Sequence, residues 1–267
     1  MTPDPVTHAV RQTVAAQRLE GWAPTDEHVA ALLALARSDV SFDGYFAAFL
    51  ARHPAPAPRR RRVSLRRVPY LIPGTTTLQN NFGVESPSAL ADLEYVATAG
   101  RMVSWLRGLA TAEPRDPLDV RLLHRHVFGD VYPWAGELRT TELRRGDHGF
   151  AWQSSLASGV DALHDAVAEV VAQGAADDAA RLAYRLARVY ADFNQLHPFR
   201  EGNGRTGALL LHEVAARCGC TLELSCVTRE AWYSAAADSM PFRRDGGASH
   251  RPFLYLLSGR TAHSPAP

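Results

Sequence analysis

The chain of 267 residues contains little cysteine and almost no net charge. Its three cysteines, Cys218, Cys220 and Cys226, fit a reducing compartment. No second cysteine pair and no His-x-x-x-His completes a zinc site with the C-x-C pair, so we expect three ordinary buried thiols. The formal net charge of +1 argues against electrostatic capture of nucleic acid.

Long apolar runs and a targeting signal are also missing. No apolar run approaches the ~20 residues needed to cross a bilayer, and the N-terminal residues MTPDPVTHAV contain no signal-peptide core. No internal repeat is visible. A hydrophobic content of 46% is enough to bury a core. We therefore expect a soluble cytoplasmic protein that does not contact membranes or nucleic acid directly.

Two helical blocks are joined by a segment rich in proline and arginine. Residues 1–52 are predicted to form three short helices, and residues 68–260 a larger domain with its core at about 117–258. The linker, residues 53–67 (HPAPAPRRRRVSLRR), is predicted to be extended and solvated, because Pro and Ala alternate before six arginines. Nucleic-acid contact, or packing on an acidic face, is the alternative for these arginines. Residues 261–267 are predicted to form a disordered tail.

Capping residues and apolar spacing predict where the helices begin and end. The first helix is expected to stop at Gly21. Two long helices are expected within residues 154–174 and 177–196, and a short hairpin within 136–153, with its turn at Gly146 and Asp147. N-caps are predicted at Thr25, Ser41, Ser86, Asp116 and Thr228, with Pro87 and Pro117 at first helical positions.

The densest group of reactive side chains lies in HPFREGNGR, from His197 to Arg205. Pro198 is predicted to end the preceding helix and to hold His197 extended, and a buried helix follows the glycines. Gly202 and Gly204 allow positive φ and close backbone approach. The free N–H groups at the start of the new helix then form an anion site.

The side chains of this loop suit phosphate chemistry. Arg205 is a planar, permanently charged donor for phosphate. Glu201 would repel phosphate directly, but its oxygens suit a Mg²⁺ that bridges phosphate oxygens. His197 has the intrinsic pKa of a general base. Each feature alone is common, whereas together they predict phosphoryl or nucleotidyl transfer.

HPFREGNGR resembles the signature His-Pro-Phe-x-Asp/Glu-Gly-Asn-Gly-Arg of the Fic family, and residues 121–140 (RLLHRHVFGDVYPWAGELRT) resemble the segment that precedes it. The resemblance spans about residues 68–257. It implies a mainly α fold: a Fic-type helical core with a short β-hairpin flap, preceded here by a small three-helix inhibitory block. Most Fic proteins transfer AMP from ATP to a Ser, Thr or Tyr hydroxyl of a target protein.

The resemblance also implies roles for single residues. His197 would be the base that activates the target hydroxyl, Glu201 would hold Mg²⁺ on the α- and β-phosphates, and Phe199 would pin the loop into the core. The hairpin would be a flap that aligns a target segment as an added strand. The phosphate-binding residues would be Arg200, Gly202, Asn203, Gly204 and Arg205, and the target-docking flap Thr140, Thr141, Glu142 and Leu143.

One position departs from the family pattern. A second arginine usually stands three residues after the first and meets the γ-phosphate, but this chain has Ala208 there. Arg200, Arg217 or an arginine of the flap could take its place. Weak use of ATP, another donor nucleotide or an altered phosphate orientation are the alternatives.

The N-terminal block resembles an inhibitor. AAQRLEGW, residues 15–22, is similar to the inhibitory Ser/Thr-x-x-x-Glu-Gly/Asn helix of Fic enzymes, with Ala16 in place of Ser or Thr. Residues 23–50 resemble the small antitoxins that accompany Fic toxins. The resemblance implies that Glu20 competes with nucleotide phosphate, with Arg205 as its partner, and that the block docks on the Fic domain in cis or in trans. The alternative is a solvated glutamate before a helix cap.

The chain is therefore predicted to be an autoinhibited, toxin–antitoxin-like protein adenylyltransferase, a nucleotidyltransferase that uses ATP and Mg²⁺. One alternative is a Fic-fold enzyme that transfers another nucleotide or phosphate, or removes AMP. Another is a catalytically weak nucleotide-binding regulatory module. DNA gyrase and topoisomerase IV subunits are candidate targets by analogy with similar toxins.

Overall fold

A computed structural model of the chain describes residues 4–53, 68–109 and 118–263. The predicted linker lies outside the described residues except for His53, which caps the third helix. Asp116 and Pro117 also lie outside them.

Three short helices form the N-terminal block, as predicted. They are α1 (Pro5–Leu19), α2 (Asp26–Ala36) and α3 (Phe42–Arg52). The side chains of Thr25 and Ser41 accept hydrogen bonds from backbone N–H groups of the first turns of α2 and α3, so both predicted caps are confirmed. Gly21, at φ 102°, follows α1.

The rest of the chain is also helical, which confirms the mainly α prediction. Thr228 and Ser86 cap their helices as expected, and the hairpin turns at Gly146. The helices are α4 (Pro87–Leu106), α5 (Val120–Phe128), α6 (Leu156–Gly174), α7 (Ala179–Leu196), α8 (Asn203–Arg217), α9 (Arg229–Asp238) and α10 (Arg251–Leu257), with a 3-10 turn, η1 (Gln153–Ser155). Two antiparallel pairs complete the fold: β1 (Arg144–Arg145) with β2 (His148–Gly149), and β3 (Cys220–Leu222) with β4 (Thr261–His263).

Several expectations about the elements were wrong. Helix α5 begins at Val120 and is capped by Asp119, whose carboxylate accepts the N–H of Arg121 at 2.7 Å. Residues 261–263 were expected in a disordered tail but form β4. The sequence did not predict this strand, because its pairing partner β3 lies far away in the sequence. Helix α10 was not predicted, because its seven residues are too few to show a helical periodicity. Cys226 is exposed, unlike the other two thiols.

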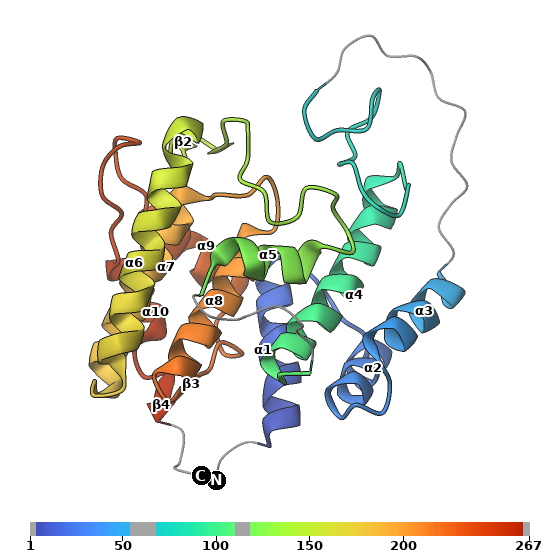
Figure 1. Cartoon of the computed structure of the whole chain (residues 1–267), viewed down its shortest axis with the longest axis horizontal. Coiled ribbons are helices and arrows are strands. Elements are labelled where there is room, and N and C mark those ends of the chain that lie inside the picture. The colour runs from blue at the N-terminus through green and yellow to red at the C-terminus, as the bar shows by residue number, and fades with distance from the viewer. Residues whose placement is uncertain (1–3, 54–67, 110–117, 264–267) are drawn as a thin grey trace.

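Helix α8 lies at the centre of the molecule. Figure 1 shows it between α1 and α4 on one side and α6 and α7 on the other, and it contacts all four. Leu209, Leu210 and Leu211 have no exposed surface. Most of the other residues of α8 are also buried, including Asn203 and Arg205 near its start. The helix whose first turn carries the sequence motif is therefore held firmly by packing along its length.

Helix α1 belongs to the same core. Val10, Val14 and Leu19 are buried against α4 and α8. Gln17 is fully buried and donates to the Thr98 hydroxyl of α4 at 2.9 Å. The thin three-helix block thus finds the partner surface that its small size requires within its own chain.

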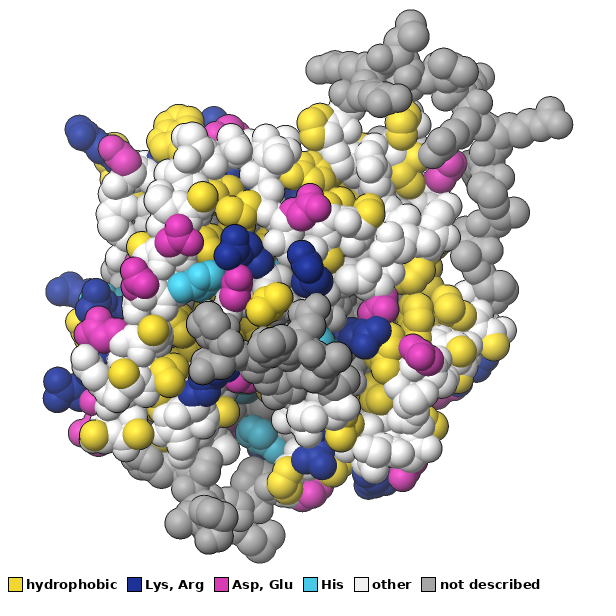
Figure 2. All heavy atoms as spheres, in the orientation of Figure 1, with side chains coloured by type: hydrophobic (Ala, Val, Ile, Leu, Met, Phe, Trp, Pro, Cys, Tyr) yellow, Lys and Arg dark blue, Asp and Glu magenta, His cyan; other side chains and the backbone are white. Residues whose placement is uncertain are grey.

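Charges of both signs are mixed over the visible surface. Figure 2 shows arginine and acidic side chains interspersed on this face, with no large patch of one sign. This distribution agrees with the net charge of +1. Among the described helices, none is both long and apolar enough to cross a membrane.

Two buried histidines make the stability of the fold depend on pH. Burial lowers the pKa of His124 and His212 to about 3, from 6.5 in the unfolded chain. Because the unfolded state binds these protons more readily, the stability that they confer is complete above pH 6.5 and decreases as pH falls toward 3. We expect His212→Leu to reduce the slope of unfolding free energy against pH, between about pH 4 and 6, by up to about 1.4 kcal/mol per pH unit. Urea unfolding at several pH values measures this slope, and an unchanged slope would contradict a neutral buried His212.

Candidate active site

The predicted motif forms a tight turn between α7 and α8. His197 ends α7 in the left-handed conformation, at φ 45° and ψ 58°, and its N–H donates to the Phe193 carbonyl at 2.9 Å. The expectation that Pro198 would hold His197 extended was therefore wrong. A following proline disfavours the right-handed helical region, and here the chain adopts a left-handed helix cap instead. Such a conformation costs a non-glycine residue about 1–3 kcal/mol, so neighbouring contacts must stabilise it.

Arg139 supplies those contacts. Its guanidinium is 1% exposed and donates to four backbone carbonyls, those of His197, Leu196, Ala151 and Thr141, at 2.6–3.2 Å. The backbone N–H of Arg139 also donates to the Pro198 carbonyl at 2.8 Å. One side chain thus joins the turn to both ends of the hairpin. Sequence analysis did not single out Arg139, because its partners are backbone atoms, most of them distant in sequence.

The imidazole of His197 is fixed by stacking and is neutral. It stacks on Phe150, with ring centroids 3.7 Å apart and planes 11° from parallel. Burial, and then the charge of Arg145, lower the pKa of His197 to about 3. The ring is therefore uncharged at neutral pH and can accept a proton.

The first turn of α8 is shaped by two glycines with different roles. Gly202 is the N-cap at φ 81°, and a Cβ there would lie 2.3 Å from the Phe128 ring. Gly204 lies inside α8 and has no positive φ. A glycine fits this position because a side chain would collide with the carboxylate of Glu20, as described below. Asn203 fixes the turn by exchanging two hydrogen bonds with the backbone of Phe199, at 2.8 and 2.9 Å. Phe199 itself has no exposed surface.

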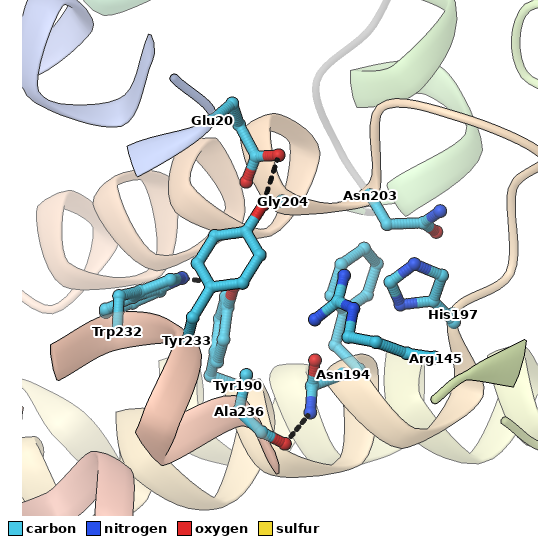
Figure 3. Close-up of a pocket in the computed structure, with 11 residues that line it drawn as sticks. Glu20, Arg145, Tyr190, Asn194, His197, Asn203, Gly204, Trp232, Tyr233 and Ala236 are labelled. Atoms are coloured by element: carbon cyan, nitrogen blue, oxygen red, sulfur yellow. Dashed lines mark hydrogen bonds between the residues drawn. The ribbon is translucent and has the colours of Figure 1, made fainter. Parts of the chain in front are cut away.

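Two adjoining cavities open beside this turn. The outer cleft has a volume of about 240 Å³ and is lined by Leu143, Arg144, Phe150, Arg200 and Glu201 together with residues shared between the two. The inner cavity has a volume of about 20 Å³, room for about one water molecule, and is closed by Tyr190, Asn194 and Trp232 (Figure 3). The shared residues are Glu20, Arg145, His197, Asn203, Gly204 and Tyr233.

Most of the predicted site residues meet at these cavities. His197, Asn203, Gly204 and Glu20 line both, and Arg200 and Glu201 line the outer cleft. Gly202 and Arg205 line neither. Of the predicted flap residues, only Leu143 reaches the cleft. The others bond elsewhere: the Thr140 N–H to the Tyr70 hydroxyl, the Thr141 carbonyl to Arg139, and the Glu142 carboxylate to Arg244.

Arg205 points into the core. Its guanidinium forms an ion pair with Glu94 of α4 and donates to the Thr98 hydroxyl at 3.2 Å. Burial opposes the charge, but Glu94, Glu20 and Glu201 together raise the pKa of Arg205. The expectation that Arg205 pairs directly with Glu20 was therefore wrong. The signal that sequence analysis missed is Glu94, a buried acid on a neighbouring helix.

Glu20 lies against the first turn of α8 (Figure 3). Its carbonyl accepts from the Tyr95 hydroxyl at 2.8 Å and its carboxylate from the Tyr233 hydroxyl at 3.3 Å. A Cβ added to Gly204 would lie 1.9 Å from a Glu20 carboxylate oxygen. Negative charge is favoured at a helix N-terminus, so the carboxylate occupies the place where an anion would bind. The alternative of a freely solvated glutamate does not hold.

Glu201 offers one carboxylate to the outer cleft. Its pKa is raised by burial and by Glu94. Its carbonyl accepts from His124, whose other ring nitrogen accepts the Gly136 N–H at 2.8 Å, so the proton of this imidazole is on Nε2. No cluster of three potential metal-ligating residues occurs in the described parts of the chain. A metal here would need further oxygens from a ligand, which is how Mg²⁺ commonly binds.

The contact between Glu20 and Gly204 can be tested by stability alone. We expect Gly204→Ala to destabilise the wild-type protein by about 1–3 kcal/mol, because the new methyl group displaces the carboxylate. In a Glu20→Gly background the same change should be neutral or stabilising by up to about 1 kcal/mol, since alanine favours the helix. Urea unfolding of the four proteins gives the coupling energy. An equal effect of Gly204→Ala in both backgrounds would show that the two residues do not touch.

Comparisons with known proteins agree with this geometry. The Fic/DOC family model matches residues 114–215. The chain is 30% identical over 170 residues to the probable protein adenylyltransferase Fic of Escherichia coli K12, covering 63% of this chain and 82% of that protein. It is 31% identical over 176 residues to a protein adenylyltransferase of Bartonella henselae, covering 60% of this chain and 32% of that protein.

Solved structures show the same fold. The BepC protein of Bartonella tribocorum with bound AMPPNP superposes with a TM-score of 0.61 at 21% identity, covering 73% of this chain and 97% of that one. The Fic domain of a Bartonella effector from strain AR 15-3 has a TM-score of 0.64, also at 21% identity, and covers 76% of this chain and 95% of that one. The family model does not reach the N-terminal block, whose resemblance to antitoxins stays a prediction. On these matches, the chain belongs to the Fic/DOC family.

Proposed function

We propose that the protein is a protein adenylyltransferase, which transfers AMP from ATP to a hydroxyl group of a target protein. The observation that carries this proposal is the position of the neutral imidazole of His197 beside the open first turn of α8, in one cleft with Glu201. The relatives named protein adenylyltransferase, and the bound AMPPNP of a structural neighbour, support it.

In this proposal the phosphates of ATP lie at the start of α8. The backbone N–H groups of Asn203 and Gly204 would donate to the phosphate oxygens, and the helix dipole favours the negative charge of the phosphates. Arg200, which lines the same cleft, adds a charged donor. Gly202 contributes by allowing the turn, and Arg205 by anchoring it to Glu94, rather than by direct contact.

His197 then accepts the proton of the target hydroxyl. The hydroxyl oxygen forms a bond to the α-phosphorus as the bond from that phosphorus to the pyrophosphate oxygen breaks. Stacking on Phe150 and the carbonyl bonds of Arg139 hold the ring and its backbone, so little reorganisation is needed. Because its pKa lies well below 7, His197 is unprotonated over the physiological pH range.

Glu201 fits a magnesium site. It presents a single hard oxygen ligand at the cleft, and the phosphates of ATP would complete the coordination. When bound, Mg²⁺ neutralises charge on the phosphate oxygens and lets them approach the carboxylate.

We also propose that Glu20 inhibits the enzyme from within its own chain. Its carboxylate competes with phosphate for the N-terminus of α8, and the inner cavity is too small for any part of a nucleotide while Glu20 is in place. Arg229 donates to the Leu19 carbonyl at 3.1 Å and so helps to hold the end of α1. A toxin–antitoxin role would follow if removal of this inhibition harms a host cell.

The target would bind along the hairpin. The Leu143 carbonyl accepts the Phe150 N–H at 3.1 Å, so the facing edges of the two hairpin strands bond to each other. A target segment would therefore pair with an outer edge of the hairpin. DNA gyrase and topoisomerase IV subunits are the first candidates by analogy. Transfer of another nucleotide or phosphate, or removal of AMP, would give a different mass change on the same target.

Intact-mass analysis after incubation with ATP and Mg²⁺ tests this function. We expect wild type to add little AMP to itself or to a candidate target, and Glu20→Gly to add at least about tenfold more. Adding His197→Ala to that variant should reduce the rate by about 10²–10⁴-fold, the usual effect of losing a general base. Glu27→Gly is the matched control, because Glu27 is an exposed glutamate of the same block paired with Arg52.

Each unexpected outcome would contradict a different part of the proposal. Unchanged incorporation with His197→Ala would show that another group is the base. If Glu20→Gly behaves like Glu27→Gly while transfer proceeds, the inhibitory role is wrong. Nucleotide binding without any product in all variants would favour the regulatory binding module.

A further inference from the structure

Arg145 extends from the hairpin into the candidate active site. It is the second residue of β1, and its side chain lines both the inner cavity and the outer cleft. Figure 3 shows its guanidinium directed into the space between His197 and Tyr233, on the opposite side of the cavity from Glu20. The hairpin therefore places a permanent positive charge beside the candidate base.

This guanidinium has no hydrogen-bonding or acidic partner within the described parts of the chain. Its only recorded contacts are with aromatic faces, 5.1 Å from the Tyr233 ring centroid and 5.5 Å from that of Phe150. Arg139, Arg205 and Arg229, by contrast, all donate to protein oxygens. The five donors of Arg145 are available to an anion that enters from solvent.

The charge of Arg145 already acts on the site. After burial, it is the largest influence that lowers the pKa of His197. The sequence contains no lysine, so arginines supply all the permanently charged side-chain cations near the cleft. A phosphate at the start of α8 would take the place of the Glu20 carboxylate and lie in the same space that Arg145 faces.

The other arginines considered for this place are less suitable. Arg217 ends α8, about 20 Å from its first turn at 1.5 Å per residue, and pairs with Glu213. Arg144 donates to the Asp147 carbonyl within the hairpin at 3.1 Å. Arg200 lines only the outer cleft. Ala208, where the family pattern has a second arginine, is 1% exposed and lines neither cavity.

We propose that Arg145 binds the phosphate chain of the nucleotide and determines the preference for nucleoside polyphosphates over nucleosides. The inference rests on the proposed function, because it assumes that the nucleotide enters this cleft. A guanidinium can donate two parallel hydrogen bonds to phosphate oxygens, and such charge-assisted bonds are strong.

Titration calorimetry of nucleotide binding tests this role directly. In the Glu20→Gly background with Mg²⁺, we expect Arg145→Gln to weaken binding of a non-hydrolysable ATP analogue by at least about tenfold and binding of adenosine by less than about twofold. Measurements with AMP and ADP show at which phosphate the loss begins. Arg145→Lys should recover part of the affinity, since it keeps the charge without the planar pair of donors.

Arg217→Gln is the control, because it removes an arginine from the far end of α8 and should leave both affinities unchanged. Thermal unfolding checks that Arg145→Gln folds normally, as expected for an exposed side chain that forms no hydrogen bond or ion pair with the described parts of the chain. Equal losses for adenosine and the ATP analogue, or no loss for either, would overturn the inference. If the variants bind as expected but no AMP is transferred, only the proposed function fails; if AMP is transferred and Arg145→Gln binds normally, only the role of Arg145 fails.

Discussion

The burial of most of α8 is the constraint on which the rest of the structure depends. A helix without an exposed apolar face must be packed on all sides, and five other helices and β3 provide that enclosure. Its first turn, however, opens toward the two cavities, so the free N–H groups of a rigid helix meet a small polar space. Arg205 is buried in the same turn, and the Glu94 carboxylate is what makes that burial tolerable, since an unpaired charge there would be strongly destabilising. The geometry of the site is thus a consequence of core packing.

The same packing decides how the proposed inhibition by Glu20 could be relieved. The apolar face of α1 is part of the common core. Moving the helix away from α8 would expose Val10, Val14 and Leu19, and each would lose about 1.5–3 kcal/mol of hydrophobic stabilisation. Gln17 would also lose its bond to Thr98. Displacing the Glu20 side chain alone costs less, because its carboxylate loses only a long hydrogen bond to Tyr233 and its place at the N-terminus of α8. In the proposed inhibition, a nucleotide would therefore displace the side chain while the helix stays in place.

The arginines around the site differ in role according to how deeply each side chain is buried. Arg139 and Arg205 are buried and bond to protein oxygens, so they fix the backbone of the turn and the position of α8. Arg145 and Arg200 line the cleft and can meet a ligand. A motif arginine that sequence comparison assigns to phosphate can thus be structural, while a hairpin arginine outside the motif faces the ligand space.

Local patterns in the sequence determined the helices, most of their caps, the hairpin turn at Gly146 and the grouping of His197, Glu201 and the glycines. These features depend on residues within a few positions of one another, so no tertiary information is needed. Only the folded chain decided that Arg205 pairs with Glu94, that Arg139 holds His197 in a left-handed conformation, that β4 joins β3, and that Arg145 lines the same cavity as His197. In most of these contacts the partners are separated by about forty to more than a hundred residues, and local propensity carries no information about which of many arginines and acids will meet after the core has packed.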